Sequence, residues 1–214
     1  NTTINNIKVN SDGYIVKTGG MIGLSQGALT INDVTMTNLD VGNTFTLADY
    51  STATSNYAGT NTLQYQTLAA GGIAGAIDST VTMNNVQIGS LNESEYIKVH
   101  IDNASAPAYS SYGIGGYIGR ANDGSDKFTM TGCKLLGYHS GTTYTTQILS
   151  HGCVGGIAGN EYASTVTDFE LQGVYMEGAR ACGGLVGWSQ DSFKAENTSI
   201  SQLYIRVPVN RTDK

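Results

Sequence analysis

The chain has 214 residues, of which 13% are charged, and its formal net charge is −6. This sparse and acidic charge excludes the basic surface that nucleic-acid binding requires. The sequence contains no apolar run of membrane-spanning length and no recognisable signal peptide. Because the first residues already lie inside a repeat, we expect the chain to be a mature or excised segment of a longer precursor.

An eight-residue pattern recurs along the chain, with apolar and polar residues alternating on both sides of a pair of small polar residues. Its copies are Thr2–Val9, Leu29–Met36, Val81–Ile88, Phe128–Leu135, Phe169–Met176 and Phe193–Ile200. Alternation with period two predicts a strand on each side, and Asn or Gly between the strands suits a tight corner. Self-similarity at this spacing predicts a stacked-repeat protein, in which each repeat buries its apolar face on its neighbours.

The aligned copies place apolar residues in columns that we expect to face the core. The column that faces outward is mainly threonine. Its charged members, Glu170 and Lys194, come from successive copies, and we expect them to form a surface ion pair. Cys133 occupies an inward column, where a cysteine acts as a small core residue.

A second element, made of two glycines, two apolar residues and a further glycine, precedes five of the copies. It occurs at Gly19–Gly23, Gly71–Gly75, Gly115–Gly119, Gly155–Gly159 and Gly183–Gly187. We interpret it as the third short strand of each turn. Because both of its central residues are apolar, we expect its outer face to be covered, either by the chain's own loops or by another molecule.

These patterns predict an all-β fold, a parallel β-helix of about six turns with long loop insertions at one corner. We expect one repeat domain, residues 1–205, followed by a C-terminal tail, residues 206–214. The insertions lie within Thr37–Ala70, Gly89–Ile114 and Leu136–Val154. In the second insertion, Tyr96–Ile101 alternates in the manner of a strand.

Tyrosine is the informative aromatic residue, with 13 copies against one tryptophan. The tyrosines of the insertions are Tyr50, Tyr57, Tyr65, Tyr96, Tyr109, Tyr112, Tyr138 and Tyr144. Because the insertions emerge from one corner of successive turns, we expect a single tyrosine-rich flank that binds a glycan or another protein. The alternative is that these rings hold the loops against the apolar outer face of the Gly-Gly element.

The three cysteines cannot all pair within the chain. Cys153 precedes its Gly-Gly pair by two residues and Cys182 precedes the next one by a single residue. This offset places the two thiols on opposite faces of the strand, so a disulfide between them would need a local shift of register.

No motif in the sequence predicts catalysis, a cofactor or a metal site. Polysaccharide-cleaving β-helices need carboxylates clustered on one outer face, and the outward columns lack such a cluster. Asp123 and Asp126 share a short loop that we interpret as a solvated turn rather than a calcium site. The histidines, His100, His139 and His151, have no metal-ligand spacing. We therefore predict that the chain is not an enzyme.

The Gly-Gly-apolar-apolar-Gly element, followed by strands with an Asn corner, resembles the GLUG repeats of bacterial cell-surface proteins. The best matches are Ala181–Ser189 and His151–Asn160, and the resemblance extends over most of the chain. It implies a right-handed parallel β-helix on an exported, adhesin-like protein, located outside the cell or on its surface. No catalytic residue is implied, because the repeat itself defines none.

Three functions remain for comparison with the structure. The first is a non-catalytic structural or adhesive segment whose partner is a host or matrix protein or a glycan. The second is a subunit of an extracellular filament that binds copies of itself, because open solenoid ends expose strand edges and apolar core. The third is a polysaccharide-active β-helix enzyme, which would depend on Asp123, Asp126 or Glu170.

Overall fold

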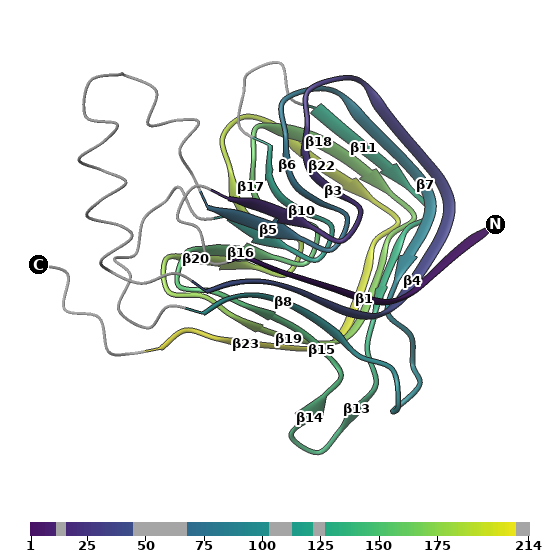
Figure 1. Cartoon of the computed structure of the whole chain (residues 1–214), viewed down its shortest axis with the longest axis vertical. Coiled ribbons are helices and arrows are strands. Elements are labelled where there is room, and N and C mark those ends of the chain that lie inside the picture. Colours follow the sequence, from purple (N-terminus) through teal and green to yellow (C-terminus); the bar gives the residue numbers. More distant parts are fainter. Residues whose placement is uncertain (12–15, 45–67, 103–112, 122–126, 209–214) are drawn as a thin grey trace, which may run out of the picture.

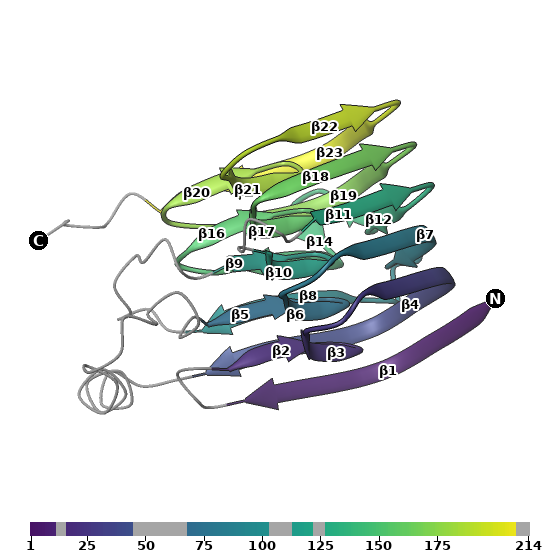
Figure 2. The same cartoon turned by 90° about the horizontal axis from the view of Figure 1, so that it is seen from above.

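The computed structural model describes residues 1–11, 16–44, 68–102, 113–121 and 127–208. Within these ranges the regular elements are all β-strands, and strands of successive turns pair in parallel. Figure 1 looks down the stack of turns, and Figure 2 shows the turns lying one above another from β1 to β23. The chain therefore forms the parallel β-helix that the repeats predict.

Two narrow sheets contain the short strands of the turns. The first has the order β2 (Lys17–Gly19), β5 (Ala69–Gly71), β9 (Gly113–Gly115), β16 (Cys153–Gly155) and β20 (Ala181–Gly183). The second contains β3 (Ile22–Ser25), β6 (Ala74–Ile77), β10 (Ile118–Ala121), β17 (Ala158–Glu161) and β21 (Val186–Ser189). Each narrow sheet has five strands, so the described residues form five complete turns, and β1 adds part of another.

An eleven-stranded sheet closes the turns. Its strands are β1 (Thr2–Ser11), β4 (Leu29–Thr44), β7 (Val81–Ile88), β8 (Ile97–Asp102), β11 (Lys127–Thr131), β12 (Lys134–Leu136), β15 (Thr146–Leu149), β18 (Ala163–Thr167), β19 (Glu170–Glu177), β22 (Phe193–Glu196) and β23 (Ser199–Arg206). The sheet bends at two corners, where residues with positive φ turn the chain. The first corner contains Asp33, Asn85, Gly132, Asp168 and Asn197, and the second contains Asn6, Asn38, Gly89, Gly173 and Gln202.

The strand register reveals that the eight-residue pattern marks both corners. The strands before the first corner align Leu29, Val81, Phe128, Ser164 and Phe193. The first copy is not in this phase, because Thr2 pairs with Val34, beyond the corner. The expected alignment of Thr2–Val9 and Phe169–Met176 with the other copies is therefore wrong. Both of these copies contain the second corner. Because apolar and polar residues alternate in the same way on either side of both corners, the sequence does not show which corner a copy contains.

This shift also changes the expected surface ion pair. Glu170 pairs with Lys134 of the preceding turn, with 2.7 Å between Oε2 and Nζ. Lys194 pairs with Glu196 of its own strand at 2.9 Å. The predicted contact between Glu170 and Lys194 is wrong, since the two residues lie on opposite sides of the first corner.

The Gly-Gly-apolar-apolar-Gly element is a bend between the two narrow sheets and not a strand. In the second turn, β5 ends at Gly71 and β6 begins at Ala74. A Cβ atom on Gly71 would lie 2.2 Å from the Ala74 carbonyl oxygen, and one on Gly75 would lie 2.4 Å from the Thr18 amide nitrogen. The two legs of this bend, which we call the glycine arch, therefore approach each other more closely than any side chain allows.

The tip of the glycine arch lies inside the turn, close to the long sheet (Figure 1). In the third turn the tip carries Tyr117, whose ring is fully buried and meets Phe169 edge-on at 5.9 Å. The Tyr117 hydroxyl lies 2.8 Å from the carbonyl oxygen of Val86 and 2.5 Å from that of Lys134, so its one proton is shared between two acceptors. Both apolar residues of the element are therefore core residues in the middle turns, and the fold itself covers the face that we expected to be covered. These core residues are Ile73, Ala74, Tyr117, Ile118, Ile157 and Ala158.

The expected insertions are each divided by a regular strand segment. Leu39–Thr44 extends β4, and β8 and β15 occupy the same place in the following turns. The predicted strand at Tyr96–Ile101 is therefore confirmed as β8. Of the insertion sequence, residues 90–96 and 138–145 lie at the second corner. Most of the remainder falls in residues 45–67 and 103–112, outside the described residues.

The cysteines follow the sequence prediction. Cys133 is fully buried, and Cys153 pairs in register with Ala181 while Val154 pairs with Cys182. The predicted offset between the two thiols is thus present, and none of the three cysteines forms a disulfide. Burial raises the pKa of Cys153 and Cys182 to about 11, so both groups are largely protonated thiols at neutral pH.

Replacing Gly71 by alanine tests the glycine arch. The added methyl group collides with the backbone of Ala74, and we expect the free energy of unfolding to fall by about 3 kcal/mol. Urea unfolding followed by circular dichroism measures the change. Gly27→Ala is the matched control, because a Cβ atom there meets no atom within 4 Å. Equal stability of the two variants would contradict the close contact between the legs.

Candidate functional site

Two insertions lie side by side at the second corner. The loop of residues 90–96 ends at Ile97, whose amide donates to the carbonyl oxygen of Thr145 at 2.9 Å. Ile97 also pairs with Thr146, the residue that follows the hairpin of residues 138–145. The insertions contain three predicted tyrosines, Tyr96, Tyr138 and Tyr144. The other five, Tyr50, Tyr57, Tyr65, Tyr109 and Tyr112, lie outside the described residues.

The hairpin presents two different faces. Its strands, β13 (His139–Ser140) and β14 (Thr143–Tyr144), pair His139 with Tyr144 and Ser140 with Thr143. Opposed pairs alternate between the two sides of a hairpin, so the aromatic pair lies on one face and the hydroxyl pair on the other. Gly141, at a φ of 61°, supplies the left-handed residue of the connecting turn.

An aromatic cluster on the first face of the hairpin consists of His139, Tyr144, Tyr175 and Tyr204. The rings of His139 and Tyr144 stack at 4.3 Å, and Tyr144 lies 5.9 Å from Tyr175 and 6.4 Å from Tyr204. Tyr175 and Tyr204 are register partners in β19 and β23, with their centroids 5.6 Å apart. The cluster thus holds the hairpin against the outer face of the long sheet.

Polar contacts continue the cluster along β19 and β23. The Tyr175 hydroxyl donates to Oε2 of Glu177 at 2.7 Å, and Arg206 lies 3.5 Å from the same oxygen. Burial, together with this hydrogen bond to a carboxylate, raises the pKa of the Tyr175 hydroxyl. The alternative to a binding role is that the insertion tyrosines hold their loops against the Gly-Gly element. The Tyr144 ring does hold its loop, but against the long sheet rather than the Gly-Gly element.

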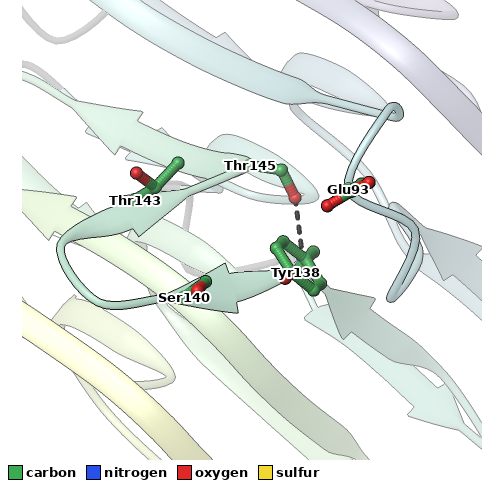
Figure 3. Close-up of a pocket in the computed structure, with 5 residues that line it drawn as sticks. All are labelled: Glu93, Tyr138, Ser140, Thr143 and Thr145. Carbon is green, nitrogen blue, oxygen red and sulfur yellow. Dashed lines mark hydrogen bonds between the residues drawn. The ribbon is translucent and has the colours of Figure 1, made fainter.

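The second face of the hairpin borders a hollow of about 330 Å³. The hollow is lined by Glu93, Tyr138, Ser140, Thr143 and Thr145 (Figure 3). Glu93 faces the hairpin from the neighbouring loop, and the Tyr138 amide donates to the Thr145 hydroxyl at 2.8 Å. All five lining residues carry polar groups, so the hollow suits a small hydrophilic ligand.

The loop of residues 90–96 is shaped by its own polar side chains. Ser90 donates to Oε2 of Glu95 at 2.5 Å, and the Asn92 side chain accepts from the amide and the hydroxyl of Ser94. The Tyr96 amide donates to Oδ1 of Asn38, the second-corner residue of the turn below. These bonds fix the backbone on both sides of Glu93. We refer to the loop, the hairpin, Tyr175 and Tyr204 together as the second-corner surface.

His100 belongs to a row of charged side chains on neighbouring strands. It lies between two carboxylates, with Nε2 3.0 Å from Asp40 and Nδ1 2.6 Å from Asp102. Asp40 also lies 3.7 Å from Nζ of Lys8, so the row joins three successive strands, β1, β4 and β8. Among the described residues no group of three or more His, Cys, Asp or Glu side chains is arranged to hold a metal ion.

The carboxylates of the described residues offer no catalytic pair near the hollow. Glycoside hydrolysis commonly uses two carboxyl groups, whereas the hollow contains only that of Glu93. Glu161 is fully buried, and burial raises its pKa while the hydroxyls of Ser189 and Ser164 oppose this shift. A carboxyl group enclosed in this way has no access to a polymer substrate. Asp123 and Asp126 lie outside the described residues.

Two members of the aromatic cluster were missed as site residues in the sequence. Tyr175 and Tyr204 each follow a second-corner residue, Gly173 or Gln202, by two positions. This shared spacing is the signal that predicts their alignment. The spacing can be recognised only when Phe169–Met176 is assigned to the second corner. If this copy is aligned with the copies that enclose the first corner, Tyr175 is not opposite Tyr204, its true register partner.

Comparison with known proteins identifies no relative from which a function follows. No family model, no curated protein and no solved structure matches the chain. The described part of the chain contains no helix that is long and apolar enough to cross a membrane. The interpretation of the second-corner surface therefore depends on its geometry and chemistry.

Replacing Tyr144 by alanine tests whether the aromatic cluster fixes the hairpin. Loss of three ring contacts is expected to lower the free energy of unfolding by about 1–2 kcal/mol and to accelerate amide exchange in residues 138–145. Hydrogen exchange read by mass spectrometry measures the effect. Tyr96→Ala is the control, because Tyr96 is exposed and contacts no other ring among the described residues. Unchanged hairpin exchange in Tyr144→Ala would contradict the assignment.

Glu161 gives the chain a predictable dependence on pH. Because burial raises its pKa in the folded state, wild-type stability falls as the pH rises above the unfolded value of 4.5. Glu161→Gln removes this loss, so the variant should unfold at a higher temperature than the wild type at pH 7 and at a similar temperature at pH 4. Glu93→Gln, at an exposed position, is the control. An advantage of Glu161→Gln that is equal at both pH values would contradict the argument.

Proposed function

We propose that the chain is a non-catalytic binding segment of an exported cell-surface protein, and that the second-corner surface contacts its partner. The observation that carries this proposal is a pair of adjacent insertions, each tied to a rigid stack of strands. One is fixed by its own hydrogen bonds and by Asn38, the other by the aromatic cluster. Ordered loops on a rigid scaffold are the usual location of binding residues.

The fold does not need these insertions. In the fourth turn Gly173 is followed directly by Val174, and the corner closes without additional residues. In the third turn the Gly137 amide donates to Gln172 of that neighbouring turn, and eight residues, 138–145, then precede Thr146. An ordered insertion at a corner that closes without one in the next turn supports a role in recognition.

The lining of the hollow and the sequence resemblance bear on the class of function. Among the residues that line the hollow, Glu93 carries the one carboxyl group, and we take this to favour binding over hydrolysis by a pair of carboxyl groups. The resemblance of the Gly-Gly element to GLUG repeats supports a place on an exported, adhesin-like protein. The partner class is a glycan or a host or matrix protein.

Self-assembly into a filament is the second candidate function. The last turn exposes Trp188, Phe193 and Ile200. Following the register partners of these residues from turn to turn leads to Leu24, Leu29 and Ile4, respectively, at the other end of the stack. Stacked copies would therefore place apolar residues against one another. Self-assembly through the ends of the stack makes no use of the two ordered insertions at the second corner, and we therefore place it second.

Excision of residues 138–145, joining Gly137 to Thr146, tests the binding function. The resulting corner reproduces the one at Gly173, so we expect a folded chain that has lost its partner. The wild-type chain is first checked by light scattering for a particle near 22.5 kDa and is then screened against immobilised glycans and matrix proteins. Partner binding by the wild type and its loss on excision support the proposal. Filaments at rising concentration, or the absence of any partner in both panels, contradict it.

A further inference from the structure

We propose that the hollow beside Glu93 binds one pyranose unit of a glycan. This inference rests on the proposed binding function and assigns a chemical class to its ligand. The hollow lies between the two insertions and is open on its outer side, so a sugar at the end or along the length of a longer glycan can enter it (Figure 3). Its volume of about 330 Å³ is at the lower limit of ligand pockets and suits a single ring.

The lining chemistry favours a ligand with several hydroxyl groups. Tyr138, Ser140, Thr143 and Thr145 each offer a hydroxyl that both donates and accepts, whereas the carboxylate of Glu93 accepts only. A ligand that satisfies this set must present donors and acceptors close together, as the neighbouring hydroxyls of a sugar do. Phosphate and sulfate are disfavoured, because the only charged lining residue is an acid.

These groups are available for a ligand. The side chains of Glu93, Ser140 and Thr143 have no hydrogen bond or ion pair to any residue within the described ranges. Thr145 already accepts from the Tyr138 amide, which leaves its hydroxyl proton free to be donated. The half-buried ring of Tyr138 adds a flat face of the kind on which a pyranose ring packs.

The backbone that carries the lining groups of the hairpin is held before binding. The Thr145 amide donates to the Tyr138 carbonyl at 3.0 Å, which closes the base of the hairpin, and the pairing of Ser140 with Thr143 places their hydroxyls opposite each other. The opposite face of the hairpin is held by the aromatic cluster. Binding therefore needs little ordering of the backbone, while the exposed side chains must still be ordered, and an open hollow with few groups implies a dissociation constant of about 1 mM for one sugar.

The test is a printed array of neutral and acidic oligosaccharides, followed by calorimetric titration of the oligosaccharides that bind. We expect Glu93→Gln and Thr143→Ala each to weaken binding at least tenfold, because the first replaces an accepting carboxylate oxygen and its charge with an amide donor, and the second removes a hydroxyl. Thr142→Ala is the matched control: Thr142 lies in the same hairpin turn and is exposed, but it does not line the hollow. All three positions are exposed, so the variants should fold as the wild type does.

The outcomes separate this inference from the proposed function. Binding of a glycan that Glu93→Gln and Thr143→Ala weaken, and that Thr142→Ala leaves intact, supports the sugar site. Equal glycan binding by all variants overturns it, because the sugar then lies elsewhere on the surface. Binding of a matrix protein but of no glycan also overturns it, while the binding function stands if excision of residues 138–145 abolishes that contact. No partner of either kind overturns both.

Discussion

Close contact between the two legs of the glycine arch is the constraint on which the rest of the structure depends. A Cβ atom on Gly71 or Gly75 would overlap backbone atoms of the facing leg or of the neighbouring turn. Because the legs meet without side chains, the arch is thin enough to lie inside the turn and bring its tip to the long sheet. There Gly72 lies against Ile88, just before the second corner. The arch therefore sets the position of the corner from which both insertions leave.

The sequence predicts the strands, the tight corners and the parallel stack, because alternation and small polar residues have direct physical meanings. It does not predict the phase of every copy. Asn6 and Asn85 are both asparagines with positive φ between alternating segments, yet they occupy different corners. The sequence also does not distinguish the glycine arch from a short strand. Two adjacent apolar residues can both be buried at the tip of a bend, as Tyr117 is, but the sequence does not show that the fold encloses this tip.

The candidate site was only partly predictable. Two of the insertion tyrosines, Tyr138 and Tyr144, lie at the second corner. Their roles differ, however, because successive residues of a hairpin point to opposite sides. Tyr144 attaches the hairpin to Tyr175 and Tyr204, while Tyr138 lines the hollow. The contribution of Glu93 depends on the proximity of two loops that are distant in sequence, and no periodic pattern encodes that proximity.

The second corner has a property that reaches beyond this one surface. The long sheet keeps its register across it whether the chain passes directly from Gly173 to Val174 or first makes the hairpin of residues 138–145. Loop length is thus uncoupled from the architecture of the coil. Such a position can accept loops of different length and sequence while the strands of the scaffold keep their pairing. It is equally the natural place to graft a foreign peptide for display.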